Sequence, residues 1–346
     1  MTSAAIEPVV TLGDAQRRSA LRHRYPLGFL IVRRVLAGIL TLVVATILIF
    51  LALLVLPGDV AAVVLGRNAT PELLTQVQQQ LGTETPLYQQ YFKFLGNLLT
   101  GDLGESTAGL VQGVHTPLSA VVGPAFANSA ILAAITMVLF VPLALGLGLW
   151  SGVRAYRRAD HIISMTSLAI SALPEFLAAT ALITVFFSWL GWLPPISSIP
   201  QGSSPLAHPA SIALPILTLL IVSLAFGSRM LRAAVIDVMA QDYVAMARLA
   251  GFSESHVLRK YVLPNALIPT IQIFAQQLQY LIGGIIVVEA VFNYPGIGSA
   301  LVRGIAVRDT QQVLVIATIL AAVYIAINLV ADVICILLDP KIRTAL

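Results

Sequence analysis

Residues 35–56 read VLAGILTLVVATILIFLALLVL, a run without a single charged side chain. A helix needs about 20 mostly apolar residues to cross the hydrocarbon core of a bilayer, so this run predicts a membrane-spanning helix. The chain as a whole has the same character: its 346 residues are 58% hydrophobic and 10% charged, with a mean hydropathy of +0.90. A soluble domain carries roughly 25% charged residues. This composition excludes a soluble enzyme, because the chain lacks the side chains to cover a water-facing surface.

Five further segments have the length and composition of membrane spans. We place them at about 125–153, 162–190, 212–227, 266–291 and 313–338. With 35–56 counted as the first span, the third span contains Glu175, the fifth Glu289 and the sixth Asp332. The sequence therefore predicts an all-α polytopic membrane protein with six transmembrane helices.

The basic residues indicate how these spans are oriented. Of the 20 Lys and Arg residues, sixteen fall in the N-terminal segment, the 2–3 and 4–5 connections and the C-terminal tail. Cytoplasmic loops carry an excess of Lys and Arg, so both termini are expected in the cytoplasm. The net charge of +4 is then an orientation signal, and nucleic acid is not needed to explain it.

The spans divide the chain into distinct parts. We expect a flexible cytoplasmic extension over 1–28, a transmembrane domain over 29–343, an external cap loop over 57–124 and a cytoplasmic loop over 228–264. In the external loop, Thr70 and Pro71 predict the start of a helix through about Leu81. The amphipathic segment 87–99 fits a helix along the membrane surface. A simple cap and a substrate-contacting surface remain alternatives for this loop.

The cytoplasmic segment 242–266 reads DYVAMARLAGFSESHVLRKYVLPNA and contains signals for two short helices. Asp242 is a suitable N-cap for a helix from Tyr243, and Gly251 suits the left-handed residue after its end. A helix of two turns is too short to be stable alone. It must be held by packing, for which the sequence offers one apolar face, made of Tyr243, Met246, Ala247 and Ala250.

A second helix is expected to start at Ser253 and to end before Pro264, with Arg259 and Lys260 facing lipid head groups or water. The loop thus presents a short knob on a braced stem. A membrane protein that presents such a knob, and has no soluble domain of its own, is expected to bind a partner protein there.

Several motifs give the chain a family resemblance. Ala245-Met246-Ala247, Gly251 and Leu263-Pro264 resemble the cytoplasmic EAA-type loop of ATP-binding-cassette (ABC) importer permeases, although that family has Glu, Ala and Ile where this chain has Ala245, Met246 and Tyr261. Other stretches resemble the first, B-type permease subunit of dipeptide, oligopeptide and nickel importers. They are Leu56-Pro57-Gly58-Asp59, Gly101-Asp102-Leu103-Gly104, residues 288–298 (VEAVFNYPGIG) and residues 338–343 (LDPKIR). The resemblance covers roughly residues 28–343, and Asp59-Val60 departs from the family's frequent Asp-Pro.

The resemblance implies a type I ABC importer permease fold in a bacterial or archaeal cell membrane. It implies four kinds of partner: a second homologous permease subunit, two cytoplasmic ATPases, an external substrate-binding protein and the lipid bilayer. ATP and Mg²⁺ would be bound by the ATPases, since this chain has no GxxxxGK[ST] sequence. No cofactor and no enzymatic activity are expected for the chain itself. The residues expected to couple to an ATPase are Asp242, Tyr243, Ala245, Met246, Ala247, Arg248, Ala250, Gly251 and Phe252.

Polar residues inside the spans are candidates for a translocation pathway. Ionisable side chains within a membrane are expensive and are functional candidates by default. The candidates are Glu175, Gln272, Gln276, Gln279 and Glu289. Each has a structural alternative. Glu175 could pair with a partner subunit or face water near the end of its span, Glu289 could brace the turn at 293–298, and the glutamines could bond to neighbouring helices. Asp332 is expected to pair across the bundle, or with Arg or Asn groups near the cytoplasmic end.

Two other functional classes are less well supported by these residues. An ion-coupled secondary transporter would use Glu175, Glu289 or Asp332 as a relay, and an intramembrane enzyme would need a catalytic grouping that the sequence does not show. The five histidines have no metal-ligand spacing and Cys335 is the single cysteine, so no metal site is expected. Peptides are the substrate class that the resemblance favours.

Overall fold

The computed structural model describes residues 26–55, 85–200 and 202–338, and within these ranges it is helical apart from turns, loops and one isolated β-bridge between Glu105 and Pro117. Within these ranges, five helices are long and apolar enough to span a membrane. They are α2 (Pro26–Val55), α7 (Leu118–Val153), α10 (Pro209–Met239), α13 (Leu263–Val291) and α15 (Thr310–Leu338). The expected spans 35–56, 125–153, 266–291 and 313–338 are thus present, each with an earlier start. The expected extension 1–28, helix 70–81 and C-terminal motif lie wholly or largely outside the described residues.

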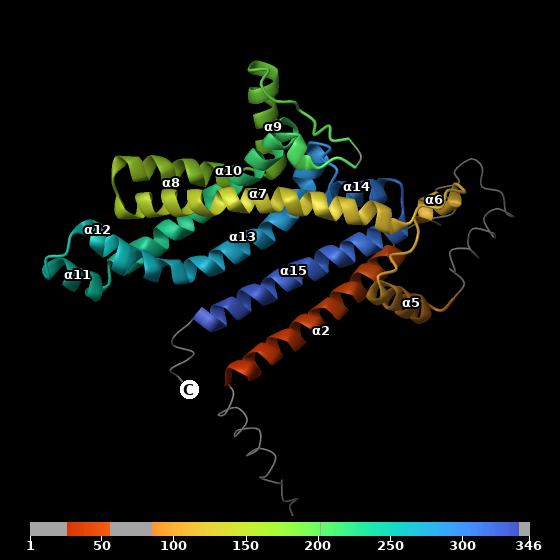
Figure 1. Ribbon diagram of the computed structural model, residues 1–346, viewed down its shortest axis with the longest axis horizontal. Coiled ribbons are helices and arrows are strands. Elements are labelled where there is room, and N and C mark those ends of the chain that lie inside the picture. The colour runs from red at the N-terminus through yellow and green to blue at the C-terminus, as the bar shows by residue number, and fades with distance from the viewer. Residues whose placement is uncertain (1–25, 56–84, 201, 339–346) are drawn as a thin grey trace, which may run out of the picture.

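The third expected span is broken. Residues 162–190 form α8 (Arg158–Ser171) and α9 (Glu175–Ile183), and α9 continues into the π-helix η2 (Thr184–Trp189). The two arms meet at 105°, so they count as one broken span or a re-entrant loop. Pro174 explains the break, because proline removes a backbone donor and disfavours helical geometry in the residue before it. Figure 1 shows α9 projecting away from the layer formed by α7, α8 and α10.

The fourth span is longer than predicted. The hydropathy pattern suggested 212–227, whereas α10 runs from Pro209 to Met239 and so takes in the first part of the expected loop 228–264. It is also the most extensively buried of the candidate spans. The continuing helix keeps backbone groups paired while Arg229 and Arg232 pass beyond the apolar stretch.

Small residues let α10 approach α7 closely. A Cβ on Gly148 would lie 2.7 Å from Leu231 Cβ, one on Gly152 would lie 2.7 Å from Val235 Cβ, and one on Gly227 would lie 2.5 Å from Phe140 Cζ. Helix pairs in membranes associate through such notches, because lipid tails are as apolar as the helices themselves. These glycines therefore set the short distance between α7 and α10.

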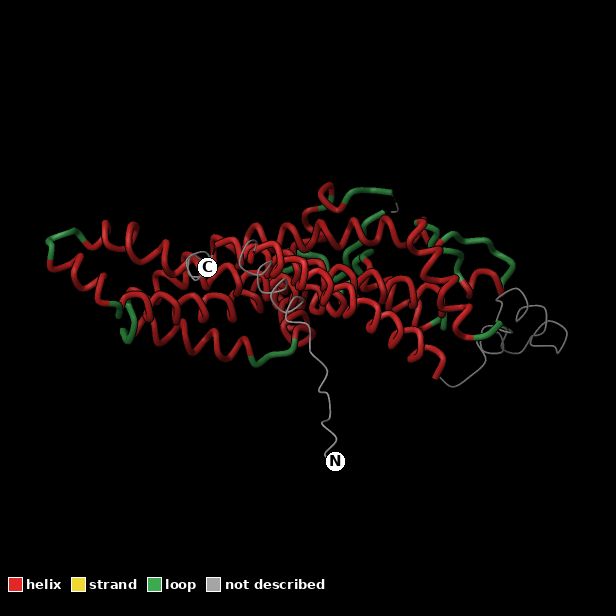
Figure 2. The backbone as a smooth tube through the Cα atoms, turned by 90° about the horizontal axis from the view of Figure 1, so that it is seen from below, coloured by secondary structure: helices red, strands yellow, loops and turns green. Residues whose placement is uncertain are grey.

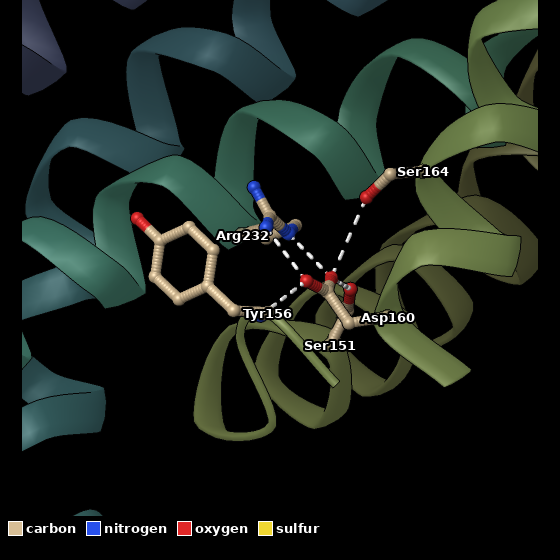
Figure 3. A network of polar contacts seen from close by, with 5 residues as sticks. All are labelled: Ser151, Tyr156, Asp160, Ser164 and Arg232. Atoms are coloured by element: carbon tan, nitrogen blue, oxygen red, sulfur yellow. Dashed lines mark hydrogen bonds and ion pairs between the residues drawn. The ribbon is translucent and has the colours of Figure 1, made fainter. Parts of the chain in front are cut away.

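A buried ion pair fastens α8 to α10 at the same end of the bundle (Figure 3). Arg232 donates from Nε to Asp160 Oδ1 at 2.5 Å and from Nη2 to Asp160 Oδ2 at 2.7 Å. Ser151 Oγ donates to Oδ1 at 2.5 Å, and the Tyr156 backbone N–H donates to Oδ2 at 2.8 Å. Asp160 is 2% exposed, and these donors satisfy its charge.

The opposite end of the molecule is organised around a second buried carboxylate. Asp309 is 1% exposed and precedes α15. Its Oδ1 accepts from the backbone N–H of Gln312 at 3.0 Å and from that of Thr107 at 3.0 Å, while its Oδ2 accepts from Ser106 Oγ. It therefore caps two helices at once, α15 and the short α6 (Thr107–Val111). The expected helix 87–99 is present as α5 (Leu87–Thr100).

The two ends of the molecule differ in structure. Figure 1 places α11 (Asp242–Leu249) and α12 (Glu254–Val257) at one end, and α5, α6 and α14 (Ile297–Ala306) toward the other. Figure 2 shows the long helices running along the same axis after a 90° turn. Helices α2 and α15 lie side by side and share an ion pair of 3.1 Å between Arg34 and Asp332. Asp332 therefore pairs with an arginine, one of the partners expected for it.

Asp160→Asn is expected to lower stability markedly, because Arg232 would keep its charge at a largely buried site without a counter-charge. Removing one partner of a buried pair costs about 3–5 kcal/mol, and we expect the lower end because Arg232 remains 23% exposed. The measurement is thermal unfolding of the detergent-purified protein. The control is Glu254→Gln, which breaks the exposed Arg248–Glu254 pair and should cost at most about 1 kcal/mol. Equal losses in the two variants would contradict this account.

Candidate functional site

The short helix α11 is held against the bundle by a small buried face. Val244 is fully buried and Ala247 is 5% exposed. Both belong to a hydrophobic cluster with residues of α10, the α12 region and the start of α13, namely Leu231, Val235, Val257, Val262 and Ala266. The bundle thus supplies the stability that a two-turn helix lacks alone.

This buried face differs from the one expected. Of Tyr243, Met246, Ala247 and Ala250, only Ala247 is buried. The expected face is therefore not the one that packs on the bundle: the buried face of α11 passes through Val244, which lies three residues before Ala247. Asp242 is the first residue of α11, and Gln241 occupies the N-cap position that was assigned to Asp242.

The apolar residues left on the outside form an exposed surface. Met246 is 65% exposed and Leu249 is 83% exposed, and Tyr243 and Phe252 are also exposed. We call these four residues the α11 surface. Ala245, Arg248 and Ala250 are exposed beside it. An exposed apolar surface at the tip of a membrane protein is typical of an interaction site.

The end of α11 is a Schellman motif. Gly251 has φ +84°, its N–H donates to Arg248 O at 3.0 Å, and the N–H of Phe252 donates to Ala247 O at 3.3 Å. The left-handed position expected for Gly251 is confirmed. Arg248 Nε also donates to Glu254 Oε1 at 2.8 Å, and Phe252 stacks on His256 with ring centroids 4.9 Å apart. These contacts fix the angle between α11 and the stem.

The stem is one continuous helical segment. The helix that begins after Ser253 was expected to end before Pro264, and this prediction is wrong: α12 passes into the π-helix η4 (Leu258–Val262) and directly into α13. A proline inside a helix removes one hydrogen bond and crowds the preceding turn. The wider π-turn just before Pro264 accommodates it. Arg259 and Lys260 point outward as expected.

A second candidate site is an open, mainly apolar cavity between α9, α13 and α15 that carries several polar side chains. It has a volume of about 740 Å³, and its polar lining residues are Glu175, Gln276, Gln279, Tyr280 and Tyr324. Tyr280 Oη donates a hydrogen bond to Glu175 Oε1. Glu175 reaches the cavity because the break at Pro174 places it at the start of α9. The cavity passes over Gly284, where a Cβ would lie 3.6 Å from Glu175 Oε1.

The structure thus brings together three of the residues predicted for a pathway, Glu175, Gln276 and Gln279. Within the described residues, no Lys, Arg or His lies within 4 Å of the Glu175 carboxylate. Gln272 is part of α13, but its side chain lies outside the described set. Tyr280 and Tyr324 were not predicted, although Tyr280 lies four residues after Gln276 on the same helix.

Glu289 makes its hydrogen bonds away from this cavity. It is fully buried and lies outside the lining of this cavity. Ser129 Oγ donates to its Oε1 at 2.5 Å, and the backbone N–H groups of Gly298 and Ser299 donate to its Oε2 at 2.8 and 3.3 Å. It therefore receives donors from the first turn of α14 and from α7. These are the contacts of a brace for the 293–298 turn, the structural alternative left open for this residue.

Taken together, the described residues define a multi-pass helical membrane protein in which a short helix, α11, presents an exposed apolar surface at one end of the bundle. Family comparison then makes the assignment. The model of the "binding-protein-dependent transport system inner membrane component" matches residues 144–344, and the model of its N-terminal domain matches residues 27–137. The chain belongs to this family, the inner-membrane permease subunits of ABC importers, whose ATPase activity resides in separate subunits.

Individual relatives place it in the peptide-type group. It is 34% identical over 313 residues to the glutathione transport system permease protein GsiC of Escherichia coli strain K12, which covers 90% of this chain and 98% of the relative. The GsiC proteins of Escherichia coli O6:H1 and Shigella dysenteriae serotype 1 match at the same identity and coverage. The resemblance to a peptide-type permease drawn from the sequence motifs is confirmed.

Gly296→Ala is expected to destabilise the α13–α14 turn. The new Cβ would lie 2.0 Å from Glu289 Oε1, so the carboxylate must move and lose donors. Overpacking of this kind typically costs about 1–3 kcal/mol. Gly283→Ala is the control, since nothing lies within 4 Å of its Cβ position. Thermal unfolding should show a loss for Gly296→Ala alone, and an unchanged midpoint for that variant would contradict the brace.

Proposed function

We propose that this chain forms one half of the translocation pathway of an ABC importer for small peptides and transmits ATPase motion through α11. The observation that carries the proposal is the α11 surface: three exposed apolar side chains on a short helix and Phe252 just after its end, with the other face of the helix packed on the bundle. The family resemblance assigns this position to the coupling helix. Both termini and α11 lie in the cytoplasm in this proposal, which the bias of the basic residues supports.

Coupling follows from the rigidity of the support. The N–H of Ala240 still bonds within the last turn of α10, and α11 begins two residues later at Asp242. Behind α11, α12, η4 and α13 form a continuous helical segment that leads to the cavity at mid-bundle. A displacement of α11 by closing ATPases would therefore move α10 and α13 together. Alternating access needs such a connection between the ATPase surface and the pathway.

The assembly proposed has four kinds of chain. A second homologous permease subunit completes the pathway, two ATPases bind ATP and Mg²⁺, and an external binding protein delivers the substrate. The peptide substrate is supported by the relatives, which are named for transport of glutathione, itself a small peptide. The cavity fits this class, because a carboxylate, two phenols and two amides can bond to ammonium and amide groups.

The rival function, an ion-coupled secondary transporter, has little support in the contacts. Two of its three carboxylates have structural partners: Asp332 pairs with Arg34, and Glu289 is bonded by α7 and α14. Glu175 alone faces a cavity. The family of the chain is that of ATP-driven importers.

Met246→Asp tests the coupling proposal. A charge at the centre of an apolar docking surface should weaken ATPase binding by more than about 30-fold, since central interface residues contribute about 2 kcal/mol or more. The measurement is co-purification of Walker-motif ATPases from native membranes in mild detergent, identified by mass spectrometry, with ATPase activity assayed on the same sample. Lys260→Gln is the control, an exposed change on the stem. Full ATPase recovery with Met246→Asp would overturn the proposal.

Glu175→Gln tests the pathway. A hydrogen bond to a charged group is worth about 1.5–3 kcal/mol, so uptake of a peptide ammonium should fall by roughly ten-fold or more. Uptake of trialanine is measured in proteoliposomes containing the complex, its binding protein and ATP. Glu105→Gln, at an exposed carboxylate paired with His115, serves as the control. Unchanged uptake with Glu175→Gln would remove this residue from the pathway.

A further inference from the structure

Two hollows run end to end along the seam between α8 and α10. The first, of about 630 Å³, is lined by Tyr156, Arg157, Arg158, Asp160, His161, Ile162, Ser164 and Arg232. The second, of about 480 Å³, has mainly apolar walls of Met165, Leu168, Phe226 and Met230. The hollows share His161, Ser164 and Arg232, so they form one groove with a basic end and an apolar end. We call it the α8–α10 groove.

The basic end carries positive charge that the described part of the chain does not neutralise. Among the described lining residues of the two hollows, Asp160 is the one acidic residue. Its oxygens already accept hydrogen bonds from Arg232, Ser151 and Tyr156 N–H (Figure 3). Arg157 and Arg158 are exposed, and within the described residues no carboxylate lies within 4 Å of either. An anion is therefore the ligand that this end fits.

The position of the basic end matches the head-group level of a membrane. The α7 span ends at Val153, directly before the turn that carries Arg157. At this boundary Trp150 lies under the Arg154 guanidinium, 4.7 Å from ring centroid to Cζ. Tryptophan and arginine gather where lipid head groups begin. The excess of basic residues marks this side of the membrane as cytoplasmic. The cytoplasmic leaflet is the one that is rich in anionic lipids.

The apolar end continues from there along both helices. Ile162, Met165 and Leu168 follow one another at helical spacing on α8, and each is about half exposed or more. Phe226 and Met230 face the groove from α10. Arg229 also lines this part, and its Nη1 donates to Ser171 Oγ of α8 at 3.3 Å. A free phosphate would use only the basic end, whereas a lipid tail would cover the apolar walls as well.

We propose that the α8–α10 groove binds one anionic phospholipid, with its phosphate at Arg157 and Arg158 and an acyl chain along Met165, Leu168 and Phe226. Bound there, the lipid contacts α8 and α10 together. Helix α10 leads into α11, so an occupied groove would stiffen the support of the coupling helix. The proposal does not depend on the transported substrate.

The test measures lipid retained by the complex purified from native membranes in mild detergent. Phosphatidylglycerol is quantified per chain by mass spectrometry, then titrated back onto delipidated complex while the unfolding midpoint is followed, with phosphatidylcholine in parallel. The test variant is Arg157→Gln/Arg158→Gln, and the matched control is Arg259→Gln/Lys260→Gln, which removes the same charge from the α12–α13 stem. Each basic residue near an anionic surface contributes about 1 kcal/mol, so the test variant should bind phosphatidylglycerol about 30-fold more weakly.

Retention by the wild type and the control, with loss in the test variant and no response to phosphatidylcholine, is the expected result. Equal retention in the test variant would overturn the proposal, and so would an equal fall in the control, which would indicate general surface charge. A midpoint shift of the same size with inorganic phosphate would show an anion site without a lipid. A test variant that keeps the lipid but loses a partner chain would show that the basic end docks protein instead.

Discussion

The close packing of α10 against α7 is the interaction on which the remaining structure depends. Gly148, Gly152 and Gly227 bring the two helices to a distance that a Cβ at any of the three would prevent. Helix α10 then also contacts α8, α9 and α13, and the Arg232–Asp160 pair closes the end of this group. Because α10 continues past the apolar stretch to Met239, the same rigid element reaches from mid-bundle to the support of α11.

Compensation of buried charge is the second constraint. A carboxylate away from water is costly unless donors satisfy it, and the structure satisfies Asp160, Asp309 and Glu289 in full. Two of the three, Asp309 and Glu289, are met by backbone N–H groups at helix starts, where the helix dipole favours negative charge. Glu175 differs, because it accepts a hydrogen bond from the phenol of Tyr280 and faces a cavity. This contrast separates the carboxylates that hold the fold from the one available to a solute.

Much of this arrangement could be predicted from the sequence, and the failures have physical causes. Apolar runs located the spans, and Gly251 located the end of α11, because both depend on local chemistry. The length of α10 could not be read from hydropathy, since Arg229 and Arg232 are accommodated by contacts from α8 that no local pattern reveals. The α11 packing face was misplaced for the same reason: Val244 and Met246 are both apolar, and the position of the bundle decides which of them is buried.

For the candidate site, the residues with suitable chemistry were easier to predict than the residues that lie next to them in space. Glu175 and the glutamines stood out as polar groups in apolar helices, but Tyr280 became part of the site only through the break at Pro174. Asp160 and Arg232 lie 72 positions apart, and no spacing rule connects them. Long-range pairing of this kind arises from the packing of the bundle, so it cannot be inferred from short stretches of sequence.

Site-specific cross-linking from α11 tests the central claim most directly. The chain has one cysteine, Cys335, so Cys335→Ser/Met246→Cys gives a single reactive thiol on the α11 surface. A short thiol-to-amine cross-linker applied to native membranes should join this chain to a protein containing a Walker A sequence. Cys335→Ser/Lys260→Cys, with its thiol on the stem, should give much less of that product. An α11 thiol that captures no ATPase, in membranes where the importer is active, would contradict the account.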